Sequence, residues 1–286
     1  MESKINNNNS ELNQLKNSIE KEIQSSKGNY AIAFEEIGND ENKIIINGDE
    51  VFHAASTMKT PVMVEVFKQA ILGRFLLEDS LEVKNEFESL VDGSIYSLDV
   101  KDDGDDKLYS LIGQKRKIYD LVYDMITVSS NLATNLLINL VSPAKVTLTM
   151  KGYGLNNIKV LRGVEDIKAY ALGLNNTVTA GDLMKLYEMI ATHNILTEKS
   201  CEEMIKILLE QKFNDKIPKY LPEDVRVAHK TGSIDRVEHD SGIIFLPDGR
   251  KYVLVVLSKD LETNESGKET IAKISKLIYD FMIGQL

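Results

Sequence analysis

The stretch that decides the fold is Ala54-Ala55-Ser56-Thr57-Met58-Lys59-Thr60-Pro61, in which a serine and a lysine stand three positions apart. Positions i and i+3 of a helix share one face, so we expect Ser56 and Lys59 to lie together on a helix that begins near Ser56. Two more short patterns follow in order, Ser-x-Asn at Ser129–Asn131 and Lys-Thr-Gly-Ser at Lys230–Ser233. Each is common by chance when it stands alone, and the informative observation is that all three occur together in this order.

The spacing of Ser56 and Lys59 predicts an activated nucleophile. An alkyl hydroxyl attacks carbonyl carbon well only when a base removes its proton, and the amine of Lys59 is the candidate base. That amine must be held partly neutral, and a cationic neighbour such as Lys230 would lower its pKa. Free amide groups in the first turn of the helix would also favour a developing oxyanion. The alternative for an isolated Ser-x-x-Lys is a capped surface helix.

Together the three patterns resemble the class A β-lactamases and the wider penicillin-binding family of serine enzymes. The likeness runs from Ser56 to the last predicted helix, and it includes Ile-Thr-Val-Ser-Ser-Asn-Leu-Ala-Thr-Asn-Leu-Leu at 126–137. The resemblance implies a serine hydrolase that opens the β-lactam amide through an acyl-enzyme on Ser56. Two alternatives stay open: a peptidoglycan peptidase or esterase of the same fold, and a non-hydrolysing penicillin-binding sensor.

The resemblance also assigns roles to the helical side of the site. Ser56 would be the nucleophile and Lys59 the general base, while Ser129 would pass a proton to the leaving nitrogen. Asn131 would contact an amide of the substrate. An alternative that needs no catalysis is that Ser129 and Asn131 cap the helix that follows them, a position that both residue types favour.

The strand side of the site would come from Lys-Thr-Gly-Ser. By resemblance, Lys230 and Thr231 would bind a carboxylate of the substrate, and the amides of Ser56 and Ser233 would bind the oxyanion. Gly232 has no side chain and would let another backbone come close. Taken alone, the segment is equally well explained as the end of a strand followed by a turn.

Two departures from the family pattern concern the loop and the water-activating base. Ser130 stands where the family usually has Asp, which helps to fix the loop by hydrogen bonds. The segment 161–170 has an arginine and an acidic pair but lacks the Leu-Asn that the family places after its deacylating glutamate. Glu165 is the candidate base, and a surface glutamate at a turn is the alternative. Loss of a positioned base would slow deacylation about 10²–10⁴-fold.

Bulk properties restrict the partners of the chain. It has 286 residues, 43% of them hydrophobic, which suffices for a large core in one domain or two interleaved subdomains. A net charge of −10 argues against nucleic acid and anionic membranes as partners, and no apolar run reaches the ~18 residues of a membrane span. The expected partner is a small β-lactam or peptide-like substrate, with no cofactor.

The start of the chain has no apolar segment of the kind that a secretory signal needs. We therefore expect a cytoplasmic protein if Met1 is the native start, and an exported one if a signal was removed. The single cysteine, Cys201, allows no intramolecular disulfide and is expected to be half-buried on a helix. The acidic stretch Asp99–Asp106 is expected to be a solvated loop. The four histidines show no metal-binding spacing, so no metal site is expected.

Hydrophobic periodicity predicts an α+β fold in which an antiparallel sheet is flanked by N- and C-terminal helices and carries an inserted all-helical lobe. Helices are expected at 10–27, 62–77, 117–126, 133–140, 180–191, 198–211 and 267–283, and strands at 30–37, 43–47, 225–229, 241–246 and 251–258. We expect a single β-lactamase-like domain, 1–286, with an α/β subdomain (10–50 plus 196–286) and a helical subdomain (51–195). A cleft between two such lobes is a natural ligand site.

Overall fold

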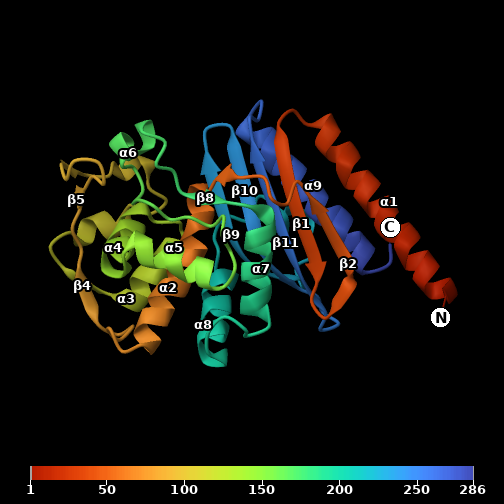
Figure 1. Cartoon of the computed structure of the whole chain (residues 1–286), viewed down its shortest axis with the longest axis horizontal. Coiled ribbons are helices and arrows are strands. Elements are labelled where there is room, and N and C mark those ends of the chain that lie inside the picture. Colours follow the sequence, from red (N-terminus) through yellow and green to blue (C-terminus); the bar gives the residue numbers. More distant parts are fainter. Residues whose placement is uncertain (1, 286) are drawn as a thin grey trace.

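The computed structural model describes residues 2–285 and places a twisted sheet with its covering helices beside a helical lobe (Figure 1). The sheet contains β1 (Asn29–Glu36), β2 (Asn39–Ile46), β9 (Arg226–Ile234), β10 (Val237–Phe245) and β11 (Lys251–Lys259). Their order is β2-β1-β11-β10-β9, and every neighbouring pair is antiparallel. The Lys-Thr-Gly segment therefore lies on β9, an edge strand of this sheet.

Alternation of side chains along the strands places one hydrophobic core on each face of the sheet. On β1, the large side chains Tyr30, Ile32 and Phe34 enter one core, whereas Ala31 and Ala33 enter the other. The first face is covered by the terminal helices α1 (Glu2–Ser25) and α9 (Asn264–Met282), which lie side by side in Figure 1. The fold class expected from the sequence is confirmed.

The second face of the sheet packs against α7 (Ala180–Ala191) and α8 (Glu198–Leu209), which connect it to the helical lobe. The lobe contains α2 (Lys59–Ile71), α3 (Ile118–Thr127), α4 (Asn131–Val141), α5 (Pro143–Gly152) and α6 (Ile167–Ala171). The lobe also contains three short 3-10 turns, η1 (Ala55–Met58), η2 (Val100–Asp102) and η3 (Lys107–Leu111). A fourth, η4 (Ile217–Tyr220), lies outside the lobe and packs against α9. The boundaries that we predicted between the two subdomains stay a prediction.

The lobe is less purely helical than expected. It carries three two-stranded sheets: β3 (Phe52–His53) with β8 (Thr177–Val178), β4 (Ser80–Glu82) with β7 (Lys115–Lys117), and β5 (Phe87–Glu88) with β6 (Ile95–Tyr96). The first lobe helix, α2, ends at Ile71 and not at 77, because Gly73 adopts a left-handed φ of 70° and its amide bonds back to the helix end. Cys201 is fully buried on α8, not half-buried.

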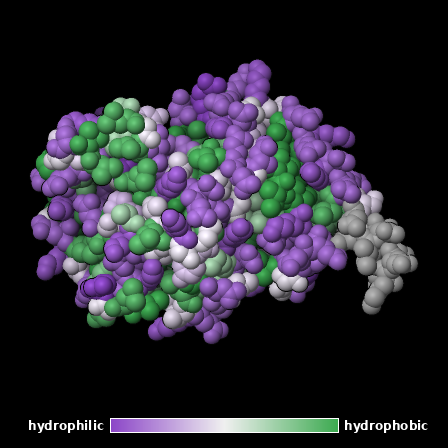
Figure 2. Space-filling model, viewed as in Figure 1, coloured by the Kyte–Doolittle hydropathy of each residue, from purple (hydrophilic) through white to green (hydrophobic). Residues whose placement is uncertain are grey.

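The surface of the lobe carries an apolar region around α6, where Ile167, Tyr170 and Leu172 are all more than half exposed. Figure 2 shows hydrophobic surface gathered in that region of the molecule. Among residues 2–285, no helix combines the length and the apolar character that crossing a bilayer would need.

Candidate active site

Ser56 lies in the 3-10 turn η1, immediately before α2. The helical segment begins near Ser56 as expected, but its first turn is of the 3-10 type and the α-helix proper begins at Lys59. Ala55, next to Ser56, has a left-handed φ of 43°, through which regular helical bonding cannot continue. The amide of Ala55 donates to His53 Nδ1 at 3.1 Å. A side chain that sequence reasoning did not select therefore supports the strained bend before the candidate nucleophile.

Lys59 is fully buried and points at the Ser-x-Asn loop. Its Nζ donates to Ser129 O at 2.7 Å, to Ser129 Oγ at 3.0 Å and to Asn131 Oδ1 at 2.9 Å. Burial lowers the pKa of Lys59 to about 7, and the carboxylates of Asp103 and Glu165 oppose that shift. The amine is thus partly neutral near pH 7, as a general base requires, and burial rather than the expected repulsion from Lys230 is the main cause.

Ser129 is the point where the two lysines meet. Its Oγ accepts from Lys59 Nζ at 3.0 Å and from Lys230 Nζ at 3.1 Å. A hydroxyl oxygen has two acceptor lone pairs and one proton to donate. With both lone pairs occupied by lysine donors, the proton of Ser129 is directed elsewhere, and the side chain lines a cavity that Ser56 also lines. Ser129 has a left-handed φ of 58°.

On β9, the four predicted residues have different surroundings. Thr231 and Ser233 line the cavity, whereas Lys230 is fully buried. Burial and the positive charge of Lys59 hold the pKa of Lys230 well below its usual range. A Cβ added to Gly232 would come within 3.2 Å of Ser56 N, so the absence of a side chain lets β9 approach the nucleophile turn. That close approach is what the sequence led us to expect.

Asn131 makes hydrogen bonds to both candidate bases, Lys59 for acylation and Glu165 for deacylation. Its Oδ1 accepts from Lys59, while its Nδ2 donates to Glu165 Oε1 at 3.0 Å and to Asp102 O at 3.2 Å. The alternative that Ser129 and Asn131 cap the helix is wrong, because the N-cap of α4 is Ser130, whose Oγ accepts from Ala133 N. Capping and site formation therefore coexist in this loop.

Glu165 lines a second cavity together with Ser56 and Asn131. Burial raises the pKa of its carboxyl above the usual range, although the hydrogen bond from Asn131 opposes this. The loop that carries it is fixed from α4, because Asn135 accepts from Val164 N at 2.7 Å and donates to Val164 O at 3.0 Å. Glu165 is thus held at the site and is not a free surface glutamate.

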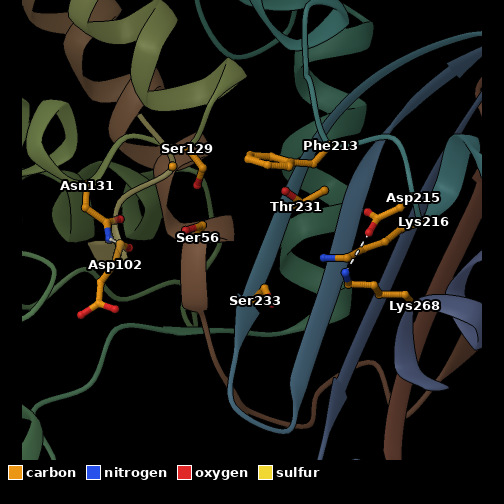
Figure 3. Close-up of a pocket in the computed structure, with 11 residues that line it drawn as sticks. Ser56, Asp102, Ser129, Asn131, Phe213, Asp215, Lys216, Thr231, Ser233 and Lys268 are labelled. Carbon is orange, nitrogen blue, oxygen red and sulfur yellow. Dashed lines mark hydrogen bonds and ion pairs between the residues drawn. The ribbon is translucent and has the colours of Figure 1, made fainter. Parts of the chain in front are cut away.

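The two cavities form one cleft between the lobe and β9, since Ser56, Asp102, Asn131 and Ser233 line both. Their volumes are about 290 and 480 Å³. In Figure 3, Ser56 lies between Ser129 and Ser233. No group of acidic, histidine or cysteine side chains within 2–285 is arranged to hold a metal ion.

Sequence reasoning missed a buried ion pair under β9. Lys216 Nζ lies 2.5 Å from Glu238 Oε2, and neither side chain exposes more than 3% of its surface. Lys216 also donates to Gly232 O, and Ser233 Oγ donates to Glu238 Oε1 at 2.6 Å, so the pair fixes the end of the Lys-Thr-Gly-Ser segment. The available signal was a run of polar residues, Glu238-His239-Asp240-Ser241, inside a strand that both cores bury.

Comparison with known proteins agrees with this geometry. Residues 14–282 match the family described as the Beta-lactamase enzyme family. The chain belongs to this family. It is therefore a hydrolase with the penicillin-binding fold and, by membership, a serine β-lactamase of the class A type.

Individual relatives are distant. β-Lactamase VEB-1 of Pseudomonas aeruginosa is 23% identical over 97% of this chain and 93% of its own length. A β-lactamase of Bacteroides uniformis is 41% identical, but the match spans only 24% of this chain and 26% of that relative. The solved structure of a PBP-A mutant, an acyl-enzyme complex with penicillin G, is 26% identical, with a TM-score of 0.81 over 96% of this chain and 97% of that one.

Proposed function

We propose that this protein hydrolyses β-lactams by forming and then releasing an ester on Ser56. The observation that carries the proposal is the position of Ser129 Oγ, which accepts hydrogen bonds from both Lys59 and Lys230 in a cleft that also exposes Ser56. Three segments that are far apart in the sequence supply these groups. The cavity exposes a nucleophile, Ser56, and a proton donor, Ser129, and the buried amine of Lys59, a base of suitable pKa, lies behind it in contact with Ser129.

In the acylation step, Lys59 takes the proton of Ser56 Oγ as that oxygen bonds to the lactam carbonyl carbon. The amides of Ser56 and Ser233 stabilise the oxyanion. The C–N bond of the lactam then breaks, and the nitrogen receives a proton from Ser129, which is resupplied from Lys59. Asn131 holds the amide of the substrate and Thr231 holds its carboxylate, while the buried amine of Lys230 donates to Ser129 Oγ.

In the deacylation step, Glu165 takes a proton from a water molecule that attacks the ester on Ser56. The raised pKa of Glu165 brings its basicity closer to that of an effective general base at neutral pH. The ester C–O bond breaks, the product leaves as a carboxylate, and Ser56 regains its proton. The hydrogen bond from Asn131 keeps Glu165 beside the cleft.

A second candidate function is a penicillin-binding protein that acylates and then stalls. It is favoured by the similarity to PBP-A, a mutant of which has been solved as an acyl-enzyme complex with penicillin G. The two functions share the acylation step and differ only in the fate of the ester. A burst of chromogenic cephalosporin hydrolysis that ends after one turnover would select the second function, and sustained turnover would select the first.

Intact-protein mass spectrometry with penicillin tests the nucleophile. Ser56→Ala should show no covalent mass gain, whereas Ser25→Ala, which removes an exposed hydroxyl from α1, should acylate like the parent protein. An undiminished mass gain in Ser56→Ala would refute the proposal. Glu165→Gln should acylate normally but retain the ester, with deacylation slowed about 10²–10⁴-fold. Glu223→Gln, an exposed loop substitution, is the control for that variant.

A further inference from the structure

The acidic stretch Asp99–Asp106 is not simply a solvated loop, as the sequence suggested, because Asp103 accepts four hydrogen bonds. Its Oδ1 accepts from Asn131 N at 2.8 Å and from Asp105 N at 3.2 Å. Its Oδ2 accepts from Leu132 N at 2.8 Å and from Tyr109 Oη at 3.0 Å. Two of these donors are the first amide groups of α4, about 30 residues further along the chain.

These bonds complete the N-terminus of α4. The first amides of a helix have no partner within the helix, and an anion beside them is stabilised by the helix dipole. Asp103 satisfies Asn131 N and Leu132 N, the N-cap Ser130 satisfies Ala133 N through its Oγ, and Ser130 O accepts from Thr134 N. Ser130 thus caps α4 locally. The family usually has an Asp at the position of Ser130, and here a carboxylate is supplied by Asp103 from a separate loop.

The same loop contacts two side chains that line the cleft, Asn131 and Glu165. Asp102 O accepts from Asn131 Nδ2, and Asp99 N donates to Glu165 Oε2 at 3.4 Å. Gly104 packs so closely on the Ser-x-Asn loop that an added Cβ would lie 1.9 Å from Val128 O. The segment therefore cannot move away from α4 without releasing groups that surround the cleft.

We propose that Asp103 is the positioning residue that holds Ser129 and Asn131 in register with Ser56. The inference rests on the proposed function, because register matters only if these groups react with one substrate. Asp103 acts through the backbone of Asn131 and Leu132 and does not line either cavity. A displacement of about 1 Å in a reacting group can cost about 10²-fold in rate, and loss of two bonds at the start of α4 permits such a displacement.

Asp103 also influences Lys59 electrostatically. The titratable groups that face Lys59 are Asp103, Glu165 and Lys230, and the negative charge of Asp103 raises the pKa of Lys59 against the effect of burial. Removal of this charge should lower that pKa. The neutral base would then persist to lower pH, so the acid limb of the acylation rate should move to lower pH.

The test compares Asp103→Ala and Asp103→Asn with Asp106→Asn. Asp106 lies on the same acidic loop and is exposed, and its side chain makes no capping bond, so its substitution removes an equal charge without the contacts. Each variant is acylated with penicillin in a stopped-flow or quenched-flow mass assay from pH 5 to 9. Thermal unfolding measured in parallel confirms that each variant is folded.

The expected result is that Asp103→Ala lowers the acylation rate about 10²-fold, and that Asp103→Asn, which keeps the shape and one acceptor, loses less. Both should shift the acid limb to lower pH, and Asp106→Asn should change neither quantity. The inference would be overturned if folded Asp103 variants acylated at the parent rate with the parent pH dependence. It would also be overturned if Asp106→Asn lowered the acylation rate as much as the Asp103 variants do. Failure of the parent protein to acylate at Ser56 would instead refute the proposed function.

Discussion

Replacing Gly232 by alanine adds one methyl group where β9 meets the nucleophile turn. The new Cβ would lie 3.2 Å from Ala55 Cβ, 3.2 Å from Ser56 N and 3.3 Å from Thr57 Cγ2. These distances are shorter than ordinary van der Waals contact. Two of the three neighbours are a backbone atom and an alanine methyl, which cannot rotate away, so β9 and η1 must separate by a few tenths of an ångström.

The separation of β9 and η1 should affect both the free energy of unfolding and the acylation rate. Overpacking a well-packed site costs about 1–3 kcal/mol, so we expect Gly232→Ala to lower the free energy of unfolding by that amount. The displaced atoms include Ser56 N and the backbone that leads into Ser233, the two proposed oxyanion donors. Loss of one oxyanion donor costs about 10²–10³-fold in rate, and a partial displacement should reach the lower end of that range.

Two measurements check this expectation, the penicillin acylation rate from quenched-flow mass spectrometry and the free energy of unfolding in urea. Gly152→Ala is the matched control, because Gly152 ends α5 and an added Cβ there would meet no atom within 4 Å. A Gly232→Ala variant that acylates at the rate of the control would refute the reasoning. It would mean that η1 and β9 separate freely, and that their contact does not position the oxyanion amides.

Three further outcomes follow from buried groups. The acylation rate should fall as the pH drops below about 7, because Lys59 is then protonated and cannot accept a proton; a rate that is constant from pH 5 to 8 would contradict this. In urea, Glu238→Gln should lower the free energy of unfolding by about 3–5 kcal/mol, because Lys216 would keep a buried, unpaired charge. Glu269→Gln, in a partly exposed pair, should have a much smaller effect. Finally, Cys201 should react with a thiol reagent only after unfolding, since its thiol is buried and its pKa is raised; rapid native labelling would contradict its position on α8.

Much of the fold could be predicted because its elements follow local patterns. The run at 30–37 predicts a strand, and the helical spacing of apolar residues predicts both terminal helices. The errors have local causes too. The apolar pattern continues past Ile71, but Gly73 adopts a left-handed conformation that ends α2.

The candidate site could be selected from the sequence where one short segment carries its chemistry. Ser56, Lys59 and the Lys-Thr-Gly-Ser segment could be selected from their order and spacing alone. Asp103, His53 and the Lys216–Glu238 pair could not, because each acts on a segment that is distant in the sequence. A lone aspartate in an acidic loop gives no local indication that it will cap a helix elsewhere.

The sequence by itself determined which residue types are available and in what order: a serine and a lysine three positions apart, a Ser-x-Asn loop, and a strand that ends in Lys-Thr-Gly-Ser. Only the tertiary structure decided that two lysine amines meet at Ser129 Oγ and that burial lowers the pKa of Lys59 to about 7. The physical reason is that motif patterns report on neighbours along the chain. Desolvation and charge proximity depend on which distant segments pack together, and these decide whether an ordinary lysine can act as a base.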